Sequence, residues 1–368
     1  MSINGMNIYI INLIMLFVWR IVFEKFKGKE KAVELSIKIT IFQMIFIAGL
    51  RDISVGTDTL TYSYIFDSAG TLDLRGLVKY YIETGYMIWN KLIHLLTHNY
   101  QFLLIANITV TLLAVKRYIQ KYSKDQFFSL FLFITIGYFM SAMNIMRQFL
   151  ALSLILFVYD FYIERKYLKT LVLSILAAMF HLSAVFILFV LLIHAILYRS
   201  KLASIKKIRC IFFCMASCVF LIIICNAENV LPVLYEMFNL KWNYKYALSG
   251  AGIEIHVFSY SLLMKIIISL LYFFLIDKLC INISERENYD FWNYVNLISC
   301  AINVLAGYLS MFSRLNLYFS VTTIIFLPNI LKSFNINKFL KCFIYIGFIV
   351  LYFTSLSSDG AVPWTSCF

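Results

Sequence analysis

The chain has 368 residues, of which 62% are hydrophobic and 14% charged, with a mean hydropathy of +0.84 and a net charge of +13. A chain this apolar is excluded from the water-soluble globular class, and its composition predicts an all-α polytopic membrane protein. The eight cysteines show no paired metal-ligand spacing, so they predict neither a disulfide framework nor a metal site.

Apolar stretches of roughly 20 residues, the length that crosses the hydrocarbon core, predict about twelve transmembrane helices in one integral membrane domain, 1–368. The stretch 167–198 reads either as one long kinked helix or as a re-entrant pair, which changes the count by one or two. The predicted spans are 7–24, 33–50, 99–116, 126–142, 146–163, 167–180, 182–198, 207–225, 258–278, 291–311, 314–331 and 338–354.

If 167–198 crosses the membrane twice, the lysine and arginine residues lie in alternate connections between these spans, and the positive-inside rule places such connections in the cytoplasm. Much of the positive charge is therefore a matter of topology, and a nucleic-acid partner has no support. The first apolar stretch lacks a basic segment before it and is predicted to be an uncleaved helix with its N-terminus outside. The basic groups are Lys25, Lys27, Lys29 and Lys31; Lys116, Arg117, Lys121 and Lys124; Arg165, Lys166 and Lys169; Arg199, Lys201, Lys206, Lys207 and Arg209; Lys278 and Arg286; and Lys332, Lys338 and Lys341.

This orientation predicts two outer loops, 51–98 and 226–257. The first begins "RDISVGTDTLTYSYIF", in which Gly56 allows a turn or a close approach and Asp58 follows two residues later. Hydroxyl groups surround this acid, and donor–acceptor hydroxyls suit a sugar. The alternative is an Asx turn with an Arg51–Asp salt bridge that caps a helix. Hydroxyl-bearing residues here include Thr57 and Tyr62.

Further along the same loop, Glu83 adds an acceptor, and 86–96 has apolar residues at helical spacing with Tyr86 and Trp89. This pattern is typical of an interfacial helix on the outer leaflet. Such a helix is expected to frame a site rather than to perform chemistry.

Three further polar positions are predicted at the outer ends of helices. Arg147 and Gln148 begin one helix, where the guanidinium is either a simple anchor or a bidentate ligand for phosphate. His181 interrupts an apolar stretch and is either a satisfied buried histidine or a base or phosphate ligand. Arg314 lies at another outer turn with Tyr318 one helical turn on. With Arg51, this places three arginines from distant parts of the chain on one membrane face. Their common location indicates an anionic ligand.

These segments, with "ETGYMIWNKLI", "MNIMRQFLALSLILF", "FHLSA", "SRLNLYF" and the final "VPWTSCF", resemble in order and rough spacing the EpsG family of bacterial Wzy-type polysaccharide polymerases over residues 45–368. The resemblance implies a fold similar to the GT-C and O-antigen ligase type in the bacterial cytoplasmic membrane. Trp364 stands where the family pattern leads us to expect tyrosine, so no hydroxyl-dependent role is assigned there.

The resemblance also implies the reaction. A growing glycan of a capsule, exopolysaccharide or O-antigen passes from undecaprenyl diphosphate to the hydroxyl of an incoming lipid-linked unit at the outer leaflet. In that reaction Asp58, Glu83 or His181 is the candidate base. Candidate partners are undecaprenyl-diphosphate-linked oligosaccharides, membrane lipids, and the flippase and chain-length regulator of the pathway, with no cofactor or metal. The candidate ligands for substrate and diphosphate are Arg51, Gly56, Thr57, Tyr62, Arg147, Gln148, Arg314 and Tyr318.

Other functions remain open on the sequence. A flippase for lipid-linked oligosaccharides needs sites reachable from both sides and often has internal repeats, and no repeat is seen. An O-antigen-type ligase or a membrane acyltransferase uses a different acceptor or donor. A non-catalytic scaffold does not account for the three arginines on the outer face.

Overall fold

A computed structural model describes residues 7–199, 260–279, 283–306, 310–334, 337–356 and 365–367. All the regular elements in these ranges are helices, and one isolated β-bridge joins Arg51 to Ser366. The predicted all-helical class is therefore confirmed.

The described residues form two compact units. The first draws on Met1–Ile187 and Thr323–Phe368, and the second on Leu188–Thr322. Helix α11 (Phe186–His194) begins at the boundary and continues as a short π-helix, Ala195–Arg199. The first unit contains α1 (Asn7–Lys27), α2 (Lys29–Gly49), α3 (Thr59–Thr71), α4 (Leu74–Lys79), α5 (Thr84–Leu96), α6 (Gln101–Tyr122), α7 (Gln126–Thr135), α8 (Tyr138–Asn144), α9 (Met146–Ile163), α10 (Tyr167–Phe180), the 3-10 helix η2 (Leu182–Val185), α18 (Thr323–Ser333) and α19 (Lys338–Leu356). The second contains α15 (Tyr260–Leu279), α16 (Ile283–Ala306) and α17 (Ser310–Ser320).

Four of the described helices are long and apolar enough to cross a membrane, or up to six if each of two bent pairs is one span. The predicted number of about twelve is not confirmed, because several other apolar helices have only 10–17 residues, less than a full crossing. The predicted span 207–225 and the predicted loop 226–257 lie outside the described residues.

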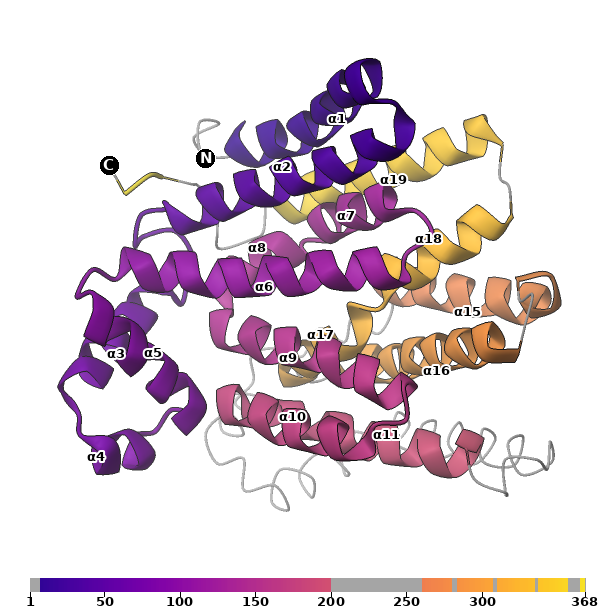
Figure 1. Cartoon of the computed structure of the whole chain (residues 1–368). Helices are drawn as coiled ribbons and strands as arrows, with labels where there is room; N and C mark the ends of the chain where they lie inside the picture. Colours follow the sequence, from indigo (N-terminus) through magenta and orange to yellow (C-terminus); the bar gives the residue numbers. More distant parts are fainter. Residues whose placement is uncertain are drawn as a thin grey trace, which may run out of the picture. The chain divides into compact units, whose positions relative to one another are not determined.

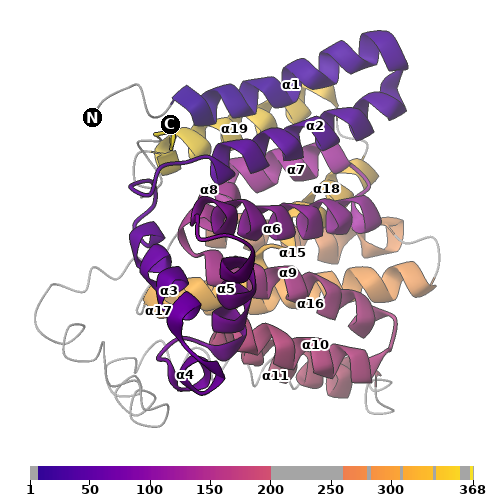
Figure 2. The ribbon, with the colours of Figure 1, turned by 60° about the vertical axis from the view of Figure 1, so that its left-hand side comes forward.

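The long helices of the first unit pack in sequence: α1 on α2, α2 on α6, α6 on α9 and α9 on α10 (Figures 1 and 2). The buried share of the most apolar 18-residue stretch rises along this row, from 22% in α1 to 72% in α9. Helix α9 is therefore central, whereas α1 presents apolar side chains such as Ile14 and Ile21 outward. Outward-facing apolar residues are what a lipid environment requires.

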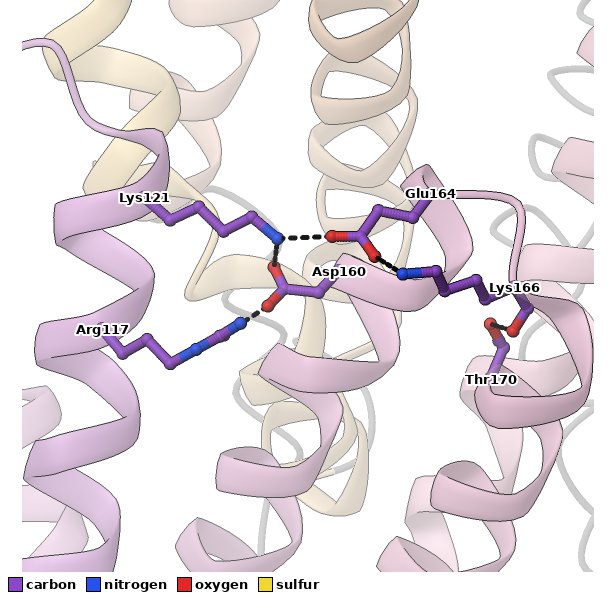
Figure 3. Close-up of polar contacts among 6 residues, drawn as sticks. All are labelled: Arg117, Lys121, Asp160, Glu164, Lys166 and Thr170. Atoms are coloured by element: carbon purple, nitrogen blue, oxygen red, sulfur yellow. Dashed lines mark hydrogen bonds and ion pairs between the residues drawn. The ribbon is translucent and has the colours of Figure 1, made fainter.

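The two ends of the first unit differ in charge. Helices α3–α5 lie where α2 ends and α6 begins, and the lysine-rich connection between α1 and α2 lies at the opposite end (Figure 1). At that basic end Arg117 and Lys121 of α6 pair with Asp160 of α9, which is 1% exposed (Figure 3). Because loss of the two basic side chains leaves the buried Asp160 carboxylate uncompensated, this network connects α6 to α9.

Glu164 extends the network beyond the last residue of α9. Its carboxylate accepts from Lys166 over 2.7 Å and from Lys121 over 2.9 Å (Figure 3). These hydrogen bonds lower the pKa of Glu164 to about 2. Its contribution to stability is therefore present above its ordinary pKa of 4.5 and is lost as the pH falls toward 2.

The predicted span 126–142 is broken rather than continuous. Helices α7 and α8 meet at an angle of 52°, and between them Gly137 has a φ of +93°. Residues with a Cβ rarely adopt this conformation, so glycine permits the break. The bend directs α8 so that its last residues, Met143 and Asn144, reach the loop after α2.

We expect Gly137→Ala to lower the free energy of unfolding by about 1–2 kcal/mol, because alanine is strained at positive φ. A Cβ there meets nothing within 4 Å, so the effect isolates backbone strain from crowding. Gly347→Ala in α19 is the matched control, since its Cβ also enters open space but its φ is ordinary. Thermal unfolding of the purified protein measures both. Equal midpoints for the two variants would contradict the strain account.

Candidate functional site

Helices α3, α4 and α5 cover the end of the first unit opposite the basic connections, and a buried apolar cluster holds them there. Tyr62 of α3 and Tyr86 of α5 contribute side chains that pack with Met146 and Leu150 of α9. Their rings meet edge to face with centroids 5.8 Å apart. Burial of these large side chains fixes the segment on the bundle.

Glu83, immediately before α5, joins three distant segments of the chain. One carboxylate oxygen accepts from the guanidinium of Arg147 on α9, and the other accepts from the backbone N–H of Leu182 over 3.1 Å. The side chains of Glu83 and Arg147 are 23% and 22% exposed, so the ion pair is partly desolvated yet open to solvent. We call Glu83, Arg147 and Leu182 the junction.

Two aromatic rings flank the guanidinium of Arg147. Its Cζ lies 5.9 Å from the centroid of Tyr62 and 6.0 Å from that of Tyr86, within the range of cation–π attraction. The Nε of Arg147 is buried and has no hydrogen-bond acceptor among the described residues. Glu83 therefore fixes one terminal nitrogen of the guanidinium, and the buried Nε is not accessible to a ligand from solvent.

His181 lies beside the junction, between α10 and η2. Its Nδ1 is 2.6 Å from the hydroxyl of Ser183, and its own carbonyl accepts from Ala184. The structure thus brings together three predicted site residues, Glu83, Arg147 and His181, from segments far apart in the sequence.

The loop after α2 carries the predicted Gly56, Thr57 and Asp58. Gly56 has a φ of +99°, and a Cβ there would lie 2.6 Å from the side-chain oxygen of Asn144. The same oxygen accepts from the N–H of Thr57 over 2.9 Å. Gly56 therefore allows the loop to approach α8 closely, rather than allowing a ligand to approach the loop. Asp58 precedes α3, with its carboxylate 3.5 Å from the exposed Thr57 hydroxyl.

Arg51, predicted as a ligand for diphosphate, is 1% exposed. Its guanidinium donates to the carbonyls of Ala48 and Met143, the latter over 2.8 Å, and no carboxylate of the described residues pairs with it. Burial lowers the pKa of Arg51 to about 10, so it stays charged at neutral pH. In this position it joins the end of α2 to the end of α8 and orders the loop.

The loop contains an Asx turn, which the sequence pattern allowed as an alternative to a sugar site. The acidic residue that forms this turn is Asp52. Asp52 accepts from the N–H and the hydroxyl of Ser54, and these bonds lower its pKa. The C-terminal residues pair with the same strand-like segment: Asp52 N–H donates to Thr365 over 2.8 Å and Cys367 N–H to Leu50 over 3.0 Å. The first and last motifs of the sequence are therefore in contact.

The remaining predicted ligands are placed differently. Gln148 is 1% exposed inside the first unit, next in sequence to Arg147. Arg314 and Tyr318 belong to α17 of the second unit, where Arg314 is exposed and Tyr318 is fully buried.

A cavity of about 160 Å³ lies elsewhere, between α7, α18 and α19 at the basic end, lined by Asp125, Pro328, Lys332, Lys341 and Tyr345 among others. Small-molecule sites usually have 300–1,000 Å³, so this cavity does not suit a lipid-linked oligosaccharide. No group of three His, Cys, Asp or Glu side chains in the described ranges is arranged to hold a metal ion.

Comparison with known proteins gives one match, to the model of the EpsG family over residues 34–366. The chain belongs to the EpsG family. Membership indicates a membrane protein of the polysaccharide-polymerase type. No curated protein and no solved structure matches the chain.

Some residues that build the junction of this EpsG-family protein were missed in the sequence. Gly85 allows α5 to approach α10 so closely that a Cβ would lie 2.7 Å from the carbonyl oxygen of Met179. The backbone N–H of Leu182 carries no side-chain signal at all. Gly85 stands two residues after Glu83, and a glycine beside an outer-loop acid is the one signal that was available.

Gly85→Ala is expected to push α5 away from α10 and to lower the free energy of unfolding by about 1–3 kcal/mol. The same shift draws Glu83 away from Leu182, so Arg147 loses its fixed position and activity falls. Thermal unfolding and glycan length on gels measure the two effects. Thr84→Ala, on the adjacent residue, is the control that leaves the approach intact. Full stability of Gly85→Ala would show that the helices do not depend on this contact.

Proposed function

We propose that this protein polymerises oligosaccharide repeat units carried on undecaprenyl diphosphate, at the outer leaflet of the bacterial cytoplasmic membrane, through about twelve membrane helices in a fold of the GT-C type. Family membership over residues 34–366 supports the reaction class. The observation that carries the site is the partly exposed guanidinium of Arg147, oriented by Glu83 and flanked by two tyrosines.

In the proposed reaction the hydroxyl of an incoming unit attacks the anomeric carbon of the growing glycan. The bond to the diphosphate oxygen breaks, undecaprenyl diphosphate leaves, and the hydroxyl proton passes to a base. Arg147 neutralises charge that develops on the diphosphate, for which a planar guanidinium offers two parallel donors. The second unit's exposed Arg314 is proposed to bind phosphate as well.

Glu83 is excluded as the proton acceptor. Because Glu83 already accepts from Arg147 and from Leu182, we assign it to positioning rather than to catalysis. His181 and Asp58 remain as candidate bases, and His181 is preferred because it adjoins the junction directly. Thr57 and Tyr62 are proposed to offer hydroxyls to the saccharide, and the turn at Gly56 holds them in place.

The orientation follows from the charge of the two ends. The basic connections of the first unit gather away from α3–α5, and lysine-rich ends face the cytoplasm. The junction then faces outward, where the flippase delivers lipid-linked units. The flippase and a chain-length regulator are the proposed partners.

Arg147→Lys is expected to reduce polymerisation by about 100-fold, because an ammonium keeps the charge but loses the planar bidentate fit. The test is glycan length on gels after the gene is deleted in its host and restored with wild type or variant. Arg75→Lys on α4 is the matched control, since Arg75 is exposed in the segment α3–α5 and forms no ion pair with the described residues. A normal ladder with Arg147→Lys at normal expression would remove Arg147 from the site.

The same gels separate the competing functions. Single repeat units after deletion support the polymerase. Repeat units that accumulate on the cytoplasmic side indicate a flippase instead. A finished glycan that fails to reach its final acceptor indicates a ligase.

His181→Gln is expected to lower the turnover rate by about 100-fold or more with little change in apparent substrate affinity, as for loss of a general base. Glutamine keeps a polar group near Ser183 but does not titrate. Initial rates at several concentrations of lipid-linked unit separate the two parameters. His98→Gln, at an exposed histidine, is the control. An unchanged rate would transfer the role of base to Asp58.

A further inference from the structure

A row of polar side chains runs along one face of α16 in the second unit. Asn293, Asn296, Ser299 and Asn303 are spaced by three or four residues, so they share a helix face. Asn296 and Ser299 are 1% and 0% exposed. Buried polar side chains cost free energy unless they are hydrogen-bonded, so a buried row of them requires partners.

Lys265 of α15 faces this row and is 2% exposed. With the amide of Asn316 oriented so that its oxygen accepts from the lysine, Lys265 Nζ lies 3.2 Å from that oxygen. The amide nitrogen of Asn316 then lies 2.6 Å from Ser299 Oγ. Asn296 donates to the carbonyl of Lys265 over 2.9 Å and to Ser269 over 2.8 Å. Three helices, α15, α16 and α17, therefore contribute to one buried polar cluster.

The charge of this cluster is not balanced. No carboxylate in the described parts of the chain pairs with Lys265, whose neighbours include the neutral amide of Asn316 and the thiol of Cys300. The side-chain oxygens of Asn293 and Asn296 are buried with no hydrogen-bond donor among the described residues. Within the described residues the cluster thus lacks one anion and two donors, and each absence costs free energy in a buried site.

A sugar–phosphate supplies both missing groups. Its phosphate oxygens compensate an ammonium, and its hydroxyls donate to amide oxygens. Lys265 is five residues from the start of α15, and Ser299 and Asn296 are seven and ten residues from the end of α16, which corresponds to about 8–15 Å along the helices from these ends. In the proposed orientation these ends face the outer leaflet, where lipid phosphates lie.

We propose that Lys265, Asn296, Ser299 and Asn316 form a second binding site, which takes the sugar–phosphate portion of a lipid-linked unit. This inference rests on the proposed function, because polymerisation requires two lipid-linked substrates and the junction in the first unit serves one of them. Lys265 is a binding residue here, and no chemical step is assigned to it.

The test compares binding and stability in the purified full-length protein. The probe is farnesyl diphosphate, with farnesol as the control that lacks phosphate. Lys265→Met is expected to bind the diphosphate at least tenfold more weakly while unfolding at the same temperature as wild type or higher, because a buried uncompensated charge is removed. Lys38→Met, at a lysine that is exposed on α2, is expected to change neither quantity. Unchanged binding, or a loss of stability without the probe, would overturn the site.

Asn316→Asp provides the complementary test. A carboxylate beside Lys265 balances the charge within the protein, so the unfolding temperature is expected to rise and diphosphate binding to fall at least tenfold. Retained binding in this variant would contradict the proposal. If phosphatidylglycerol competes as well as farnesyl diphosphate, the cluster is a phospholipid site and the inference is wrong.

The outcome is separable from that of the proposed function. A normal glycan ladder with wild type, together with equal binding by wild type and Lys265→Met, overturns this site alone. Absence of any effect of gene deletion on the ladder, together with Lys265-dependent binding of the diphosphate, overturns the polymerase and leaves the site standing.

Discussion

The partly desolvated ion pair between Glu83 and Arg147 is the interaction on which the proposed site depends. It connects the segment α3–α5 to the central helix α9, and the second oxygen of Glu83 connects both to Leu182. An exposed pair of this kind contributes little to stability, whereas a pair with little solvent access leaves an uncompensated charge if one partner is lost. At 22–23% exposure the pair is accessible to a ligand yet fixed in direction. That combination suits a group that must meet a diphosphate in one orientation.

A second set of contacts orders the chain next to this pair. Arg51 donates to the carbonyls of Ala48 and Met143, and Asn144 accepts from Thr57, so the loop after α2 and the end of α8 form one structure. Helix α9 begins two residues after Asn144, which places Arg147 on that structure. The C-terminal residues Thr365 and Cys367 close the same loop through backbone pairing. The motifs of the first unit therefore contact one another in space, because they hold one another in position.

Sequence reasoning could predict the features that depend on local chemistry. Apolar length and lysine placement indicate the helices and their alternating ends, and Gly56 indicates a constrained turn. The pairing of Glu83 with Arg147 could not be predicted, because the two residues are 64 positions apart and no periodicity links them. The break at Gly137 was hidden within an apolar run that continues on both sides. Arg51 was assigned to a ligand because the sequence does not show that backbone carbonyls surround it, and Lys265 was overlooked among its apolar neighbours.

The most direct measurement of the central claim is polymerisation by the purified protein in proteoliposomes supplied with the host's lipid-linked repeat unit. Glycan length followed over time reports transfer without other proteins of the pathway. The account predicts that wild type extends the glycan, that Arg147→Ala leaves single units, and that Arg75→Ala behaves as wild type. Extension by Arg147→Ala at the wild-type rate, or no extension by wild type, would contradict it.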